Sequence, residues 1–126
     1  MGFIPHKNED GALAPYEYHT ASVATKVGEA MVFSSGKLAK CGADTAPEYI
    51  AMAETAAANE IIPAIHVNGE TIFAVPLSAA GTALKVGDKV TIASDALRVT
   101  ATTASGVAEI VGMDGTAAGS TVYVRF

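Results

Sequence analysis

Short runs of alternating apolar and polar residues, separated by turn-forming residues, cover most of the chain after residue 15. A period of two is typical of a strand, and many short strands at near-regular spacing indicate an all-β sandwich or barrel. The pattern predicts strands over residues 16–20, 29–33, 37–40, 49–54, 61–67, 71–75, 89–93, 97–100, 108–113 and 121–126. We therefore expect an all-β fold, a small β-barrel or sandwich.

The dipeptide Asn68-Gly69 lies between two of these predicted strands. A type I′ turn needs positive φ at both of its central positions, and Asn-Gly accepts this conformation readily. The sequence therefore predicts a β-hairpin between residues 61–67 and 71–75.

A phrase of the sequence occurs twice. Residues 26–40, KVGEAMVFSSGKLAK, return as residues 85–99, KVGDKVTIASDALRV, at a separation of 59. A β-unit of this size buries one face of its sheet and leaves open edges, whereas two copies can cover each other. We expect a single β-domain over residues 16–126 built from two similar β-units, at about 25–66 and 84–126. The alternative is that small β-proteins share such turns by chance.

Residues 1–15 follow neither the strand nor the helix period, and they contain two prolines, two glycines and a polar cluster. This composition predicts an extended N-terminal arm. Its apolar residues are too sparse to build a core but suit docking on another surface: Phe3, Ile4 and Leu13. A plainly disordered terminus is the alternative.

Composition and charge exclude several classes of partner. Thirteen acidic and eight basic side chains give a net charge of −5, and no basic run marks a nucleic-acid surface. The longest apolar runs are too short to cross a bilayer, and the N-terminal residues lack a signal-peptide hydrophobic segment, so we expect synthesis in the cytoplasm. Only 6% of residues are aromatic and none is tryptophan, which disfavours a broad aromatic pocket.

Residue types that carry chemistry do not form a recognisable catalytic pattern. Cys41 is the single cysteine and has no nearby histidine in sequence, so it is interpreted as structural. The histidines and the turn aspartates lack the spacing of zinc or calcium ligands: His6, His19, His66, Asp88, Asp95 and Asp114. We therefore predict no catalytic residue, no metal site and no cofactor, and a protein that is not an enzyme.

The arm, the β-body rich in Gly, Ala and Thr, and the phrase LKVGDKVTIASDALRVTATTASGVAEIVGMDGTAAGSTVYVRF together resemble the decoration, or cement, proteins of bacteriophage heads. The similarity covers most of residues 25–126 and is strongest over residues 84–126. It implies a non-enzymatic structural protein of the virion that binds the outer capsid surface and stabilises subunit junctions. The implied partners are the major capsid protein and further copies of the chain, with a trimer favoured.

Such a protein needs apolar anchors on its surface, because large aliphatic and aromatic residues usually dominate contact energy. The expected capsid or partner contacts are Phe3, Ile4, Leu13, Tyr16 and Tyr18. In YEYHT the two tyrosines project to one face, where ordinary core packing is the alternative. A second hypothesis is a ligand- or carbohydrate-binding β-domain, acting as a host-surface adhesin, whose platform comprises Tyr16, Tyr18, Tyr49 or Tyr123.

Overall fold

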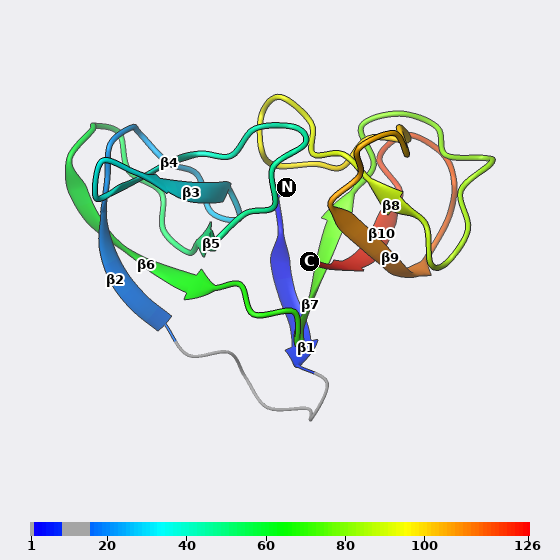
Figure 1. The fold of residues 1–126 in the computed structure, drawn as a ribbon, viewed down its shortest axis with the longest axis horizontal. Helices are drawn as coiled ribbons and strands as arrows, with labels where there is room; N and C mark the ends of the chain where they lie inside the picture. Colours follow the sequence, from blue (N-terminus) through cyan, green and yellow to red (C-terminus); the bar gives the residue numbers. More distant parts are fainter. Residues whose placement is uncertain (1, 9–15) are drawn as a thin grey trace.

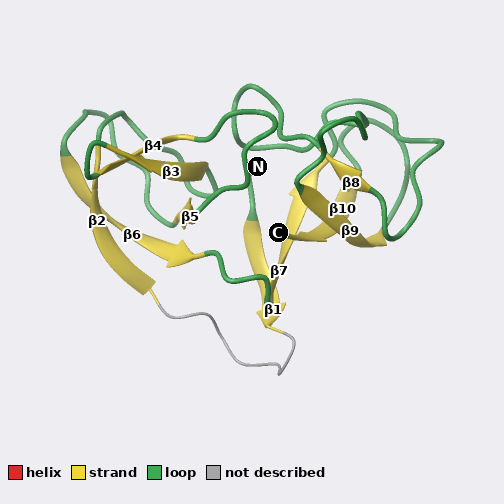
Figure 2. Cartoon of the chain, in the orientation of Figure 1, coloured by secondary structure: helices red, strands yellow, loops and turns green. Residues whose placement is uncertain are grey.

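The computed structural model describes residues 2–8 and 16–126, and these residues form ten strands and no helix (Figures 1 and 2). The all-β prediction is confirmed. No described helix is therefore long and apolar enough to span a membrane. The strands are β1 (Ile4–Asn8), β2 (Tyr16–Ala21), β3 (Ala30–Ser34), β4 (Lys37–Lys40), β5 (Tyr49–Ala51), β6 (Glu60–His66), β7 (Thr71–Pro76), β8 (Lys89–Val90), β9 (Ala108–Met113) and β10 (Thr121–Arg125).

Strands β2 to β6 close into a small barrel with the order β2-β4-β3-β5-β6. Strand β2 pairs with β6 along its whole length, from Tyr16–Ile65 to Ala21–Glu60, but meets β4 only at Ala21–Leu38. The barrel therefore opens where β2 diverges from β4. Aliphatic residues and one tyrosine fill its interior: Ala21, Met31, Leu38, Tyr49, Ala51, Ile62 and Ala64.

The remaining strands form a five-stranded sheet with the order β1-β7-β10-β9-β8. In Figure 1 the barrel lies on one side of the molecule and β8, β9 and β10 on the other, with β1 and β7 between them. Ile50 and Ile65 of the barrel belong to the same buried cluster as Phe73 and Val124 of the sheet. A shared apolar core therefore joins the barrel to the sheet.

Residues 2–8 of the predicted extended arm dock on the chain's own sheet and core rather than reaching out to another surface. Strand β1 pairs with β7, and the Phe3 side chain is fully buried in the shared core. The Phe3 amide donates to the carbonyl of Gly28 at 2.8 Å, and its ring lies 5.5 Å from that of Phe126. Proline at residue 5 is compatible with this position because β1 is the edge strand of its sheet. Residues 9–15 of the predicted arm lie outside the described residues.

The predicted hairpin around Asn68-Gly69 is wrong. Strand β6 is paired with β2 and β5 in the barrel, whereas β7 is paired with β1 and β10 in the other sheet. Gly69 has a φ of 82°, as its turn requires, and the Asn68 side chain accepts a bond from the Glu70 amide at 3.0 Å. Asn68 does not have positive φ, so the predicted type I′ turn does not form. The chain bends at Gly69 and Glu70 and connects the two sheets, because both edges of β6 are already occupied.

The repeated phrases occupy equivalent positions in the two sheets. Gly28 and Gly87 both have positive φ, 86° and 99°, and begin the repeated segments. The Gly28 amide donates to the carbonyl of Ala51 at 2.7 Å, and the Gly87 amide donates to that of Ile110 at 2.8 Å. These donors and acceptors are separated by the same 59 residues as the phrases themselves.

The strands of the second repeated unit, at about residues 84–126, differ from those of the first unit at residues 97–100. The predicted strand is reduced there to isolated bridges from Val99 to Leu77 and to Ile92, whereas β4 is a four-residue strand in the barrel. The parallel bridge Leu77–Val99 occupies the place that Ala21–Leu38 has in the barrel. Because only this single bridge forms, the strands β7, β10, β9 and β8 make an open sheet rather than a barrel. Strand β1 pairs with the outer edge of β7.

Glu29 follows Gly28 in the first repeated phrase. Its side chain is buried, with 3% of its surface exposed. Its Oε2 atom has no hydrogen-bond partner among the described residues. Burial raises the pKa of this carboxyl above its ordinary value of 4.5, although Lys40 and Lys26 oppose the shift. The folded state therefore holds the proton more tightly than the unfolded state does.

Replacing Phe3 by alanine should lower the free energy of unfolding by about 3 kcal/mol or more, because a fully buried ring is removed from the shared core. Its neighbour Ile4, 42% exposed, is the matched control, and Ile4→Ala should cost about 1 kcal/mol. Urea unfolding followed by circular dichroism measures both values. Equal, small losses would show that Phe3 does not pack as described.

Replacing Glu29 by glutamine should stabilise the protein at neutral pH, since the variant no longer needs to hold a buried carboxylate. A raised folded pKa favours the fold below pH 4.5, and this contribution is lost as the pH rises through the folded pKa. The advantage of the variant should therefore shrink as the pH falls towards 4.5. Thermal unfolding over a pH series measures it, with Glu54→Gln, at an exposed position, as the control for loss of charge.

Candidate functional site

Alternation along β2 distributes its side chains between two different surfaces. Glu17 pairs with Ala64 and His19 pairs with Ile62, so both point to the barrel side of the strand. Tyr16 and Tyr18 point to the outer side, where they are 53% and 69% exposed. A single strand thus contributes to the mouth of the barrel and to its outer wall.

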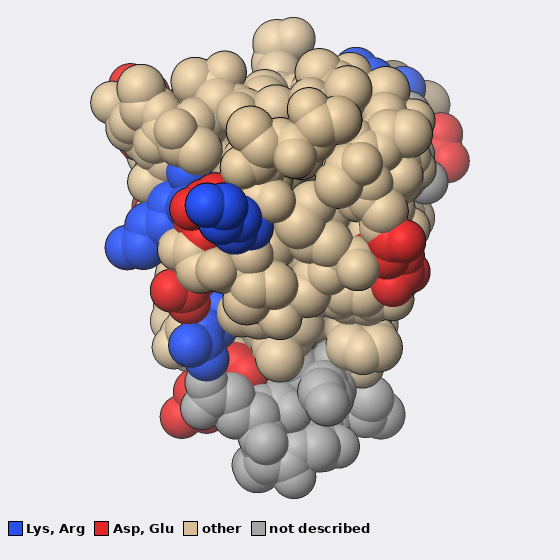
Figure 3. Space-filling view, turned by 90° about the vertical axis from the view of Figure 1, so that its right-hand side faces the viewer, with Lys and Arg blue, Asp and Glu red and all other residues tan. Residues whose placement is uncertain are grey.

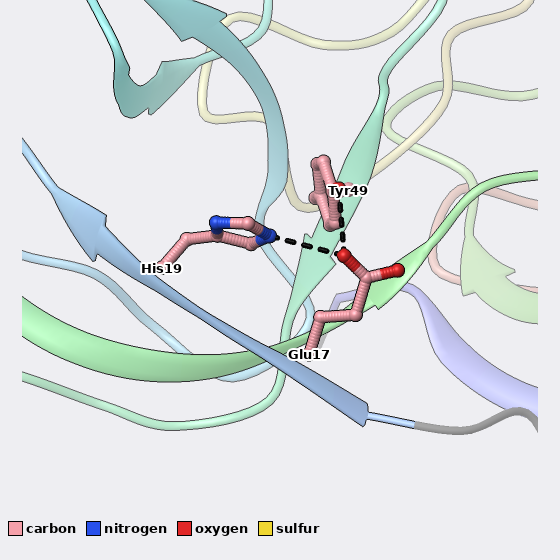
Figure 4. Close-up of polar contacts among 3 residues, drawn as sticks. All are labelled: Glu17, His19 and Tyr49. Carbon is pink, nitrogen blue, oxygen red and sulfur yellow. Dashed lines mark hydrogen bonds and ion pairs between the residues drawn. The ribbon is translucent and has the colours of Figure 1, made fainter.

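Glu17, His19 and Tyr49 make a hydrogen-bonded cluster at the barrel mouth (Figure 4). The Tyr49 hydroxyl donates to Oε1 of Glu17 at 3.0 Å, and Nε2 of His19 lies 3.1 Å from the same oxygen. Tyr49 belongs to β5, which is separated from β2 by β6. The residue of β6 opposite Glu17 is Ala64, whose small side chain leaves room for this contact.

The hydrogen bonds set the charge state of the cluster. The bond from His19, followed by that from Tyr49, lowers the pKa of Glu17 below its ordinary value of 4.5. Burial, the bond to Glu17 and the nearby Glu48 carboxylate raise the pKa of Tyr49 above its ordinary value of 10.0. Near neutral pH the site therefore holds an ionised carboxylate and a protonated phenol.

Aromatic and imidazole rings pack around Tyr49. The ring of Tyr49 lies 4.8 Å from that of His19, 5.2 Å from Phe33 and 5.1 Å from His66, between centroids. His19 and Phe33 are also in T-shaped contact at 5.0 Å. These distances fall in the range of favourable ring pairs, which hold one another in place. The Tyr49 side chain is buried, whereas Phe33 remains 37% exposed.

The cluster can act as a fixed acceptor beside an apolar ring surface. Within residues 2–8 and 16–126, no group of three His, Cys, Asp or Glu side chains is placed to hold a metal ion. Sequence reasoning did not identify Glu17 or Tyr49 as partners. The alternation of YEYHT does place Glu17 and His19 on one face. Their contact with Tyr49 depends on the pairing of both β2 and β5 with β6, which that alternation does not reveal.

The predicted contact residues are separated by the fold. Phe3 is a core residue rather than an exposed anchor, because β7 and Gly28 hold it inside the shared core. Ile4 remains 42% exposed, and Leu13 lies outside the described residues. Tyr16 and Tyr18 are exposed, so the core-packing alternative for these two is wrong. They are joined on β6 by Ile61, which is 69% exposed and pairs with Thr20.

The other chemistry-bearing residues have structural contacts. The Cys41 thiol is buried and donates to the carbonyl of Thr45 at 2.9 Å, and burial raises its pKa to about 11. It therefore remains protonated near neutral pH. Asp88 accepts from the Lys85 amide at 2.9 Å, and Asp95 accepts from the Leu97 amide at 3.0 Å. These two aspartates stabilise turns, as their positions in the sequence indicate.

A hollow of about 660 Å³ lies over β1 and β7. Its lining is mainly apolar and includes Ile4, Pro76 and Leu77, and Arg98 is also among the lining residues. Nε of Arg98 already donates to Asp95 at 2.9 Å. The hollow therefore offers apolar surface but no converging set of free polar groups.

Replacing Tyr49 by phenylalanine should raise the pKa of Glu17, because the carboxylate loses one of its two donors. Tyr16→Phe, on the opposite face of β2, should leave that pKa unchanged. Carbon-detected NMR titration of the Glu17 carboxyl measures both. An unchanged Glu17 pKa in Tyr49→Phe would contradict the hydrogen bond.

No protein-family model matches the chain, and a search of curated proteins finds no match to its sequence. The function has to be inferred from the fold, the exposed surfaces and the sequence resemblance.

Proposed function

We propose that this chain is a non-enzymatic structural protein of a bacteriophage virion, which binds the outer capsid surface and stabilises the junctions between capsid subunits. The proposal rests on the sequence resemblance and on one structural observation, the exposed apolar patch formed by Tyr16, Tyr18 and Ile61. The expected partners are the major capsid protein and neighbouring copies of the chain.

The patch has the properties of a docking surface. Tyr16 is 53% exposed, and Tyr18 and Ile61 are each 69% exposed, on strands that are paired side by side. Tyrosine is enriched among the residues that dominate binding energy. The backbone beneath the patch is fixed by the β2–β6 pairing, so docking does not have to order a loop. Rigid apolar anchors of this kind suit a protein that reinforces a preformed surface.

A second surface fits close packing with neighbouring molecules. Figure 3 faces the sheet end of the molecule and shows few charged side chains on the broad upper part of that face. Independently of that view, three loop segments of the chain also lack exposed charge: the exposed residues of 79–83, 102–105 and 116–119 are all Ala, Thr, Ser or Gly. Their burial would desolvate no charge and would immobilise little side-chain entropy. This supports self-association, for which a trimer is the expected state.

The carbohydrate-binding alternative receives no comparable support. The suggested platform residues were Tyr16, Tyr18, Tyr49 or Tyr123. Of these, Tyr49 is only 6% exposed and lies inside the barrel mouth. The Tyr123 hydroxyl donates to Asp114 at 3.0 Å on the other sheet. Tyr49 and Tyr123 therefore do not extend the exposed pair of Tyr16 and Tyr18, which is the only part of the suggested platform that the described residues place together on the surface.

The proposal is tested by co-sedimentation with expanded empty heads of the phage that encodes the chain. Parent protein should bind saturably, and the double variant Tyr18→Ser with Ile61→Ser should bind roughly tenfold more weakly or worse. Val86→Ser, at an aliphatic position that is 65% exposed outside the patch, is the matched control and should bind normally. Absence of saturable binding by the parent would overturn the proposal.

Removal of residues 1–15 would not test docking. It would delete Phe3 and β1 from the chain's own core, so weaker binding by the truncated protein would report misfolding. The surface variants avoid this ambiguity, because their side chains make little contact with the core.

A further inference from the structure

Strand β2 has one backbone edge without a partner in the described part of the chain. Its other edge pairs with β6 along the whole strand, whereas β4 meets β2 only at Ala21–Leu38. Strand β4 begins at Lys37, so it does not extend beside the earlier residues of β2. Residues 16–20 therefore present an edge on which no other described strand pairs.

The hydrogen-bond pattern shows which backbone groups face this free edge. Tyr18 lies opposite Pro63 of β6, and the carbonyl of Pro63 accepts from the Met52 amide at 2.9 Å, so it is directed away from β2. Opposite residues of an antiparallel pair either bond to each other or both direct their N–H and C=O groups outwards. The N–H and C=O of Tyr18 therefore face the free edge, and alternation directs those of Tyr16 and Thr20 the same way.

The second repeated unit shows that this edge of the fold accepts a strand. Tyr18 lies three residues before the parallel bridge of Ala21, and Ala74 lies three residues before the equivalent bridge of Leu77. One edge of β7 at Ala74 pairs with β10, as β2 pairs with β6, and the other edge pairs with Ile4 of β1. The equivalent of the free β2 edge is thus occupied by an antiparallel strand.

The free edge also lacks the features that keep the other outer strands from pairing. Strand β1 contains Pro5 and Lys7 with a bulge between them, and β8 has only two residues. Residues 16–20, YEYHT, contain no proline, lysine or bulge, and Tyr and Thr favour strands. Proteins usually block or cover a long strand edge, because it is a template for pairing with another chain. The β2 edge therefore has the features of one that is covered in an assembly.

The sequence of this edge is complementary to itself in one antiparallel register. With Tyr18 opposite Tyr18 of a second copy, Tyr16 lies opposite Thr20, so all the outward N–H and C=O groups bond in reciprocal pairs. Glu17 then lies opposite His19 of the second copy, which pairs a carboxylate with an imidazole. Opposed tyrosines also form a favourable cross-strand pair.

Neighbouring registers fit less well. Centring on Glu17 would place two carboxylates opposite each other, which is destabilising. Centring on His19 would place Tyr16 opposite Ser22, whose amide already donates to the carbonyl of Leu38 at 2.8 Å.

We propose that two copies of this chain pair through the free edge of β2, antiparallel and centred on Tyr18, to form a two-fold dimer with a continuous β6-β2-β2-β6 sheet. Such an isologous contact uses the same surface of both copies. It lies in the plane of the sheet, so the outer faces of Tyr16 and Tyr18 stay exposed and the two patches become neighbours. The dimer requires no capsid and does not use loops 79–83, 102–105 or 116–119, so this inference and the proposed function can fail independently.

Sedimentation equilibrium of the full chain should show a monomer–dimer equilibrium. Tyr18→Pro removes an outward N–H from each copy without removing a bond to β6, and should weaken dimerisation about tenfold or more. Tyr18→Ser keeps the N–H and should dimerise more tightly than Tyr18→Pro, whereas Val86→Ser should match the parent. Circular dichroism checks that each variant is folded. A monomeric parent at all concentrations, or an oligomer that a folded Tyr18→Pro variant leaves unchanged, would overturn the proposal.

Amide hydrogen exchange of the unmodified chain gives a second readout that needs no variant. The amides of Tyr16, Tyr18 and Thr20 should become protected as the protein concentration rises, because they bond only in the dimer. Those of Glu17 and His19 should be protected at every concentration, since they face β6. Dimerisation without this alternating change would show that the copies meet elsewhere.

The register is measured by isotope-filtered NMR on a mixture of labelled and unlabelled chains. Opposed residues of a pair without mutual hydrogen bonds have Cα atoms about 4.5 Å apart, which brings their Hα protons close. A contact between the Hα of Glu17 and that of His19 in the other copy is therefore expected. A contact between the two Glu17 Hα protons in its place would contradict centring on Tyr18.

Discussion

The antiparallel pairing of β2 with β6 is the contact on which both exposed surfaces depend. It runs from Tyr16–Ile65 to Ala21–Glu60 and closes the barrel against a strand that is already paired with β5. The register places Glu17 and His19 on the barrel side, and Tyr16 and Tyr18 outside. A slip of one residue would exchange these faces, burying tyrosines at the mouth and exposing the charged pair.

The burial of Phe3 has a comparable role for the molecule as a whole. The residue precedes the barrel in the chain, but it packs in the core shared with the sheet and bonds to Gly28 at the first repeated turn. A side chain at Gly28 would have its Cβ 2.7 Å from the Phe3 nitrogen, so the close approach requires glycine. The N-terminal segment thus ties the barrel to the sheet.

The two surfaces differ in their chemistry. The patch on the outer wall is apolar and gains by being removed from water, whereas the barrel mouth presents an oriented carboxylate beside rings. An apolar contact supplies affinity over a broad area, and a directional polar contact restricts the orientation of the partner.

The sequence determined most of the strands that follow residue 15. Alternation over residues 16–20, 37–40, 71–75 and 108–113 corresponds closely to β2, β4, β7 and β9, and the all-β class follows from such segments. It also placed the two tyrosines of YEYHT on one face, and with them Glu17 and His19 on the other. These features are local, because the period of a strand is fixed by its own backbone.

Tertiary structure decided which strands meet. The chain bends at Gly69, within the dipeptide where the sequence indicates a turn, but β6 and β7 pair elsewhere because other strands occupy their edges. Strand β1 lacks the alternation of a strand and forms because β7 offers it an edge and the core accepts Phe3. The contact between Glu17 and Tyr49 likewise requires β2 and β5 to pair on either side of β6, with Ala64 between them. Pairing is a competition among all available edges and buried surfaces, and a local pattern does not contain its outcome.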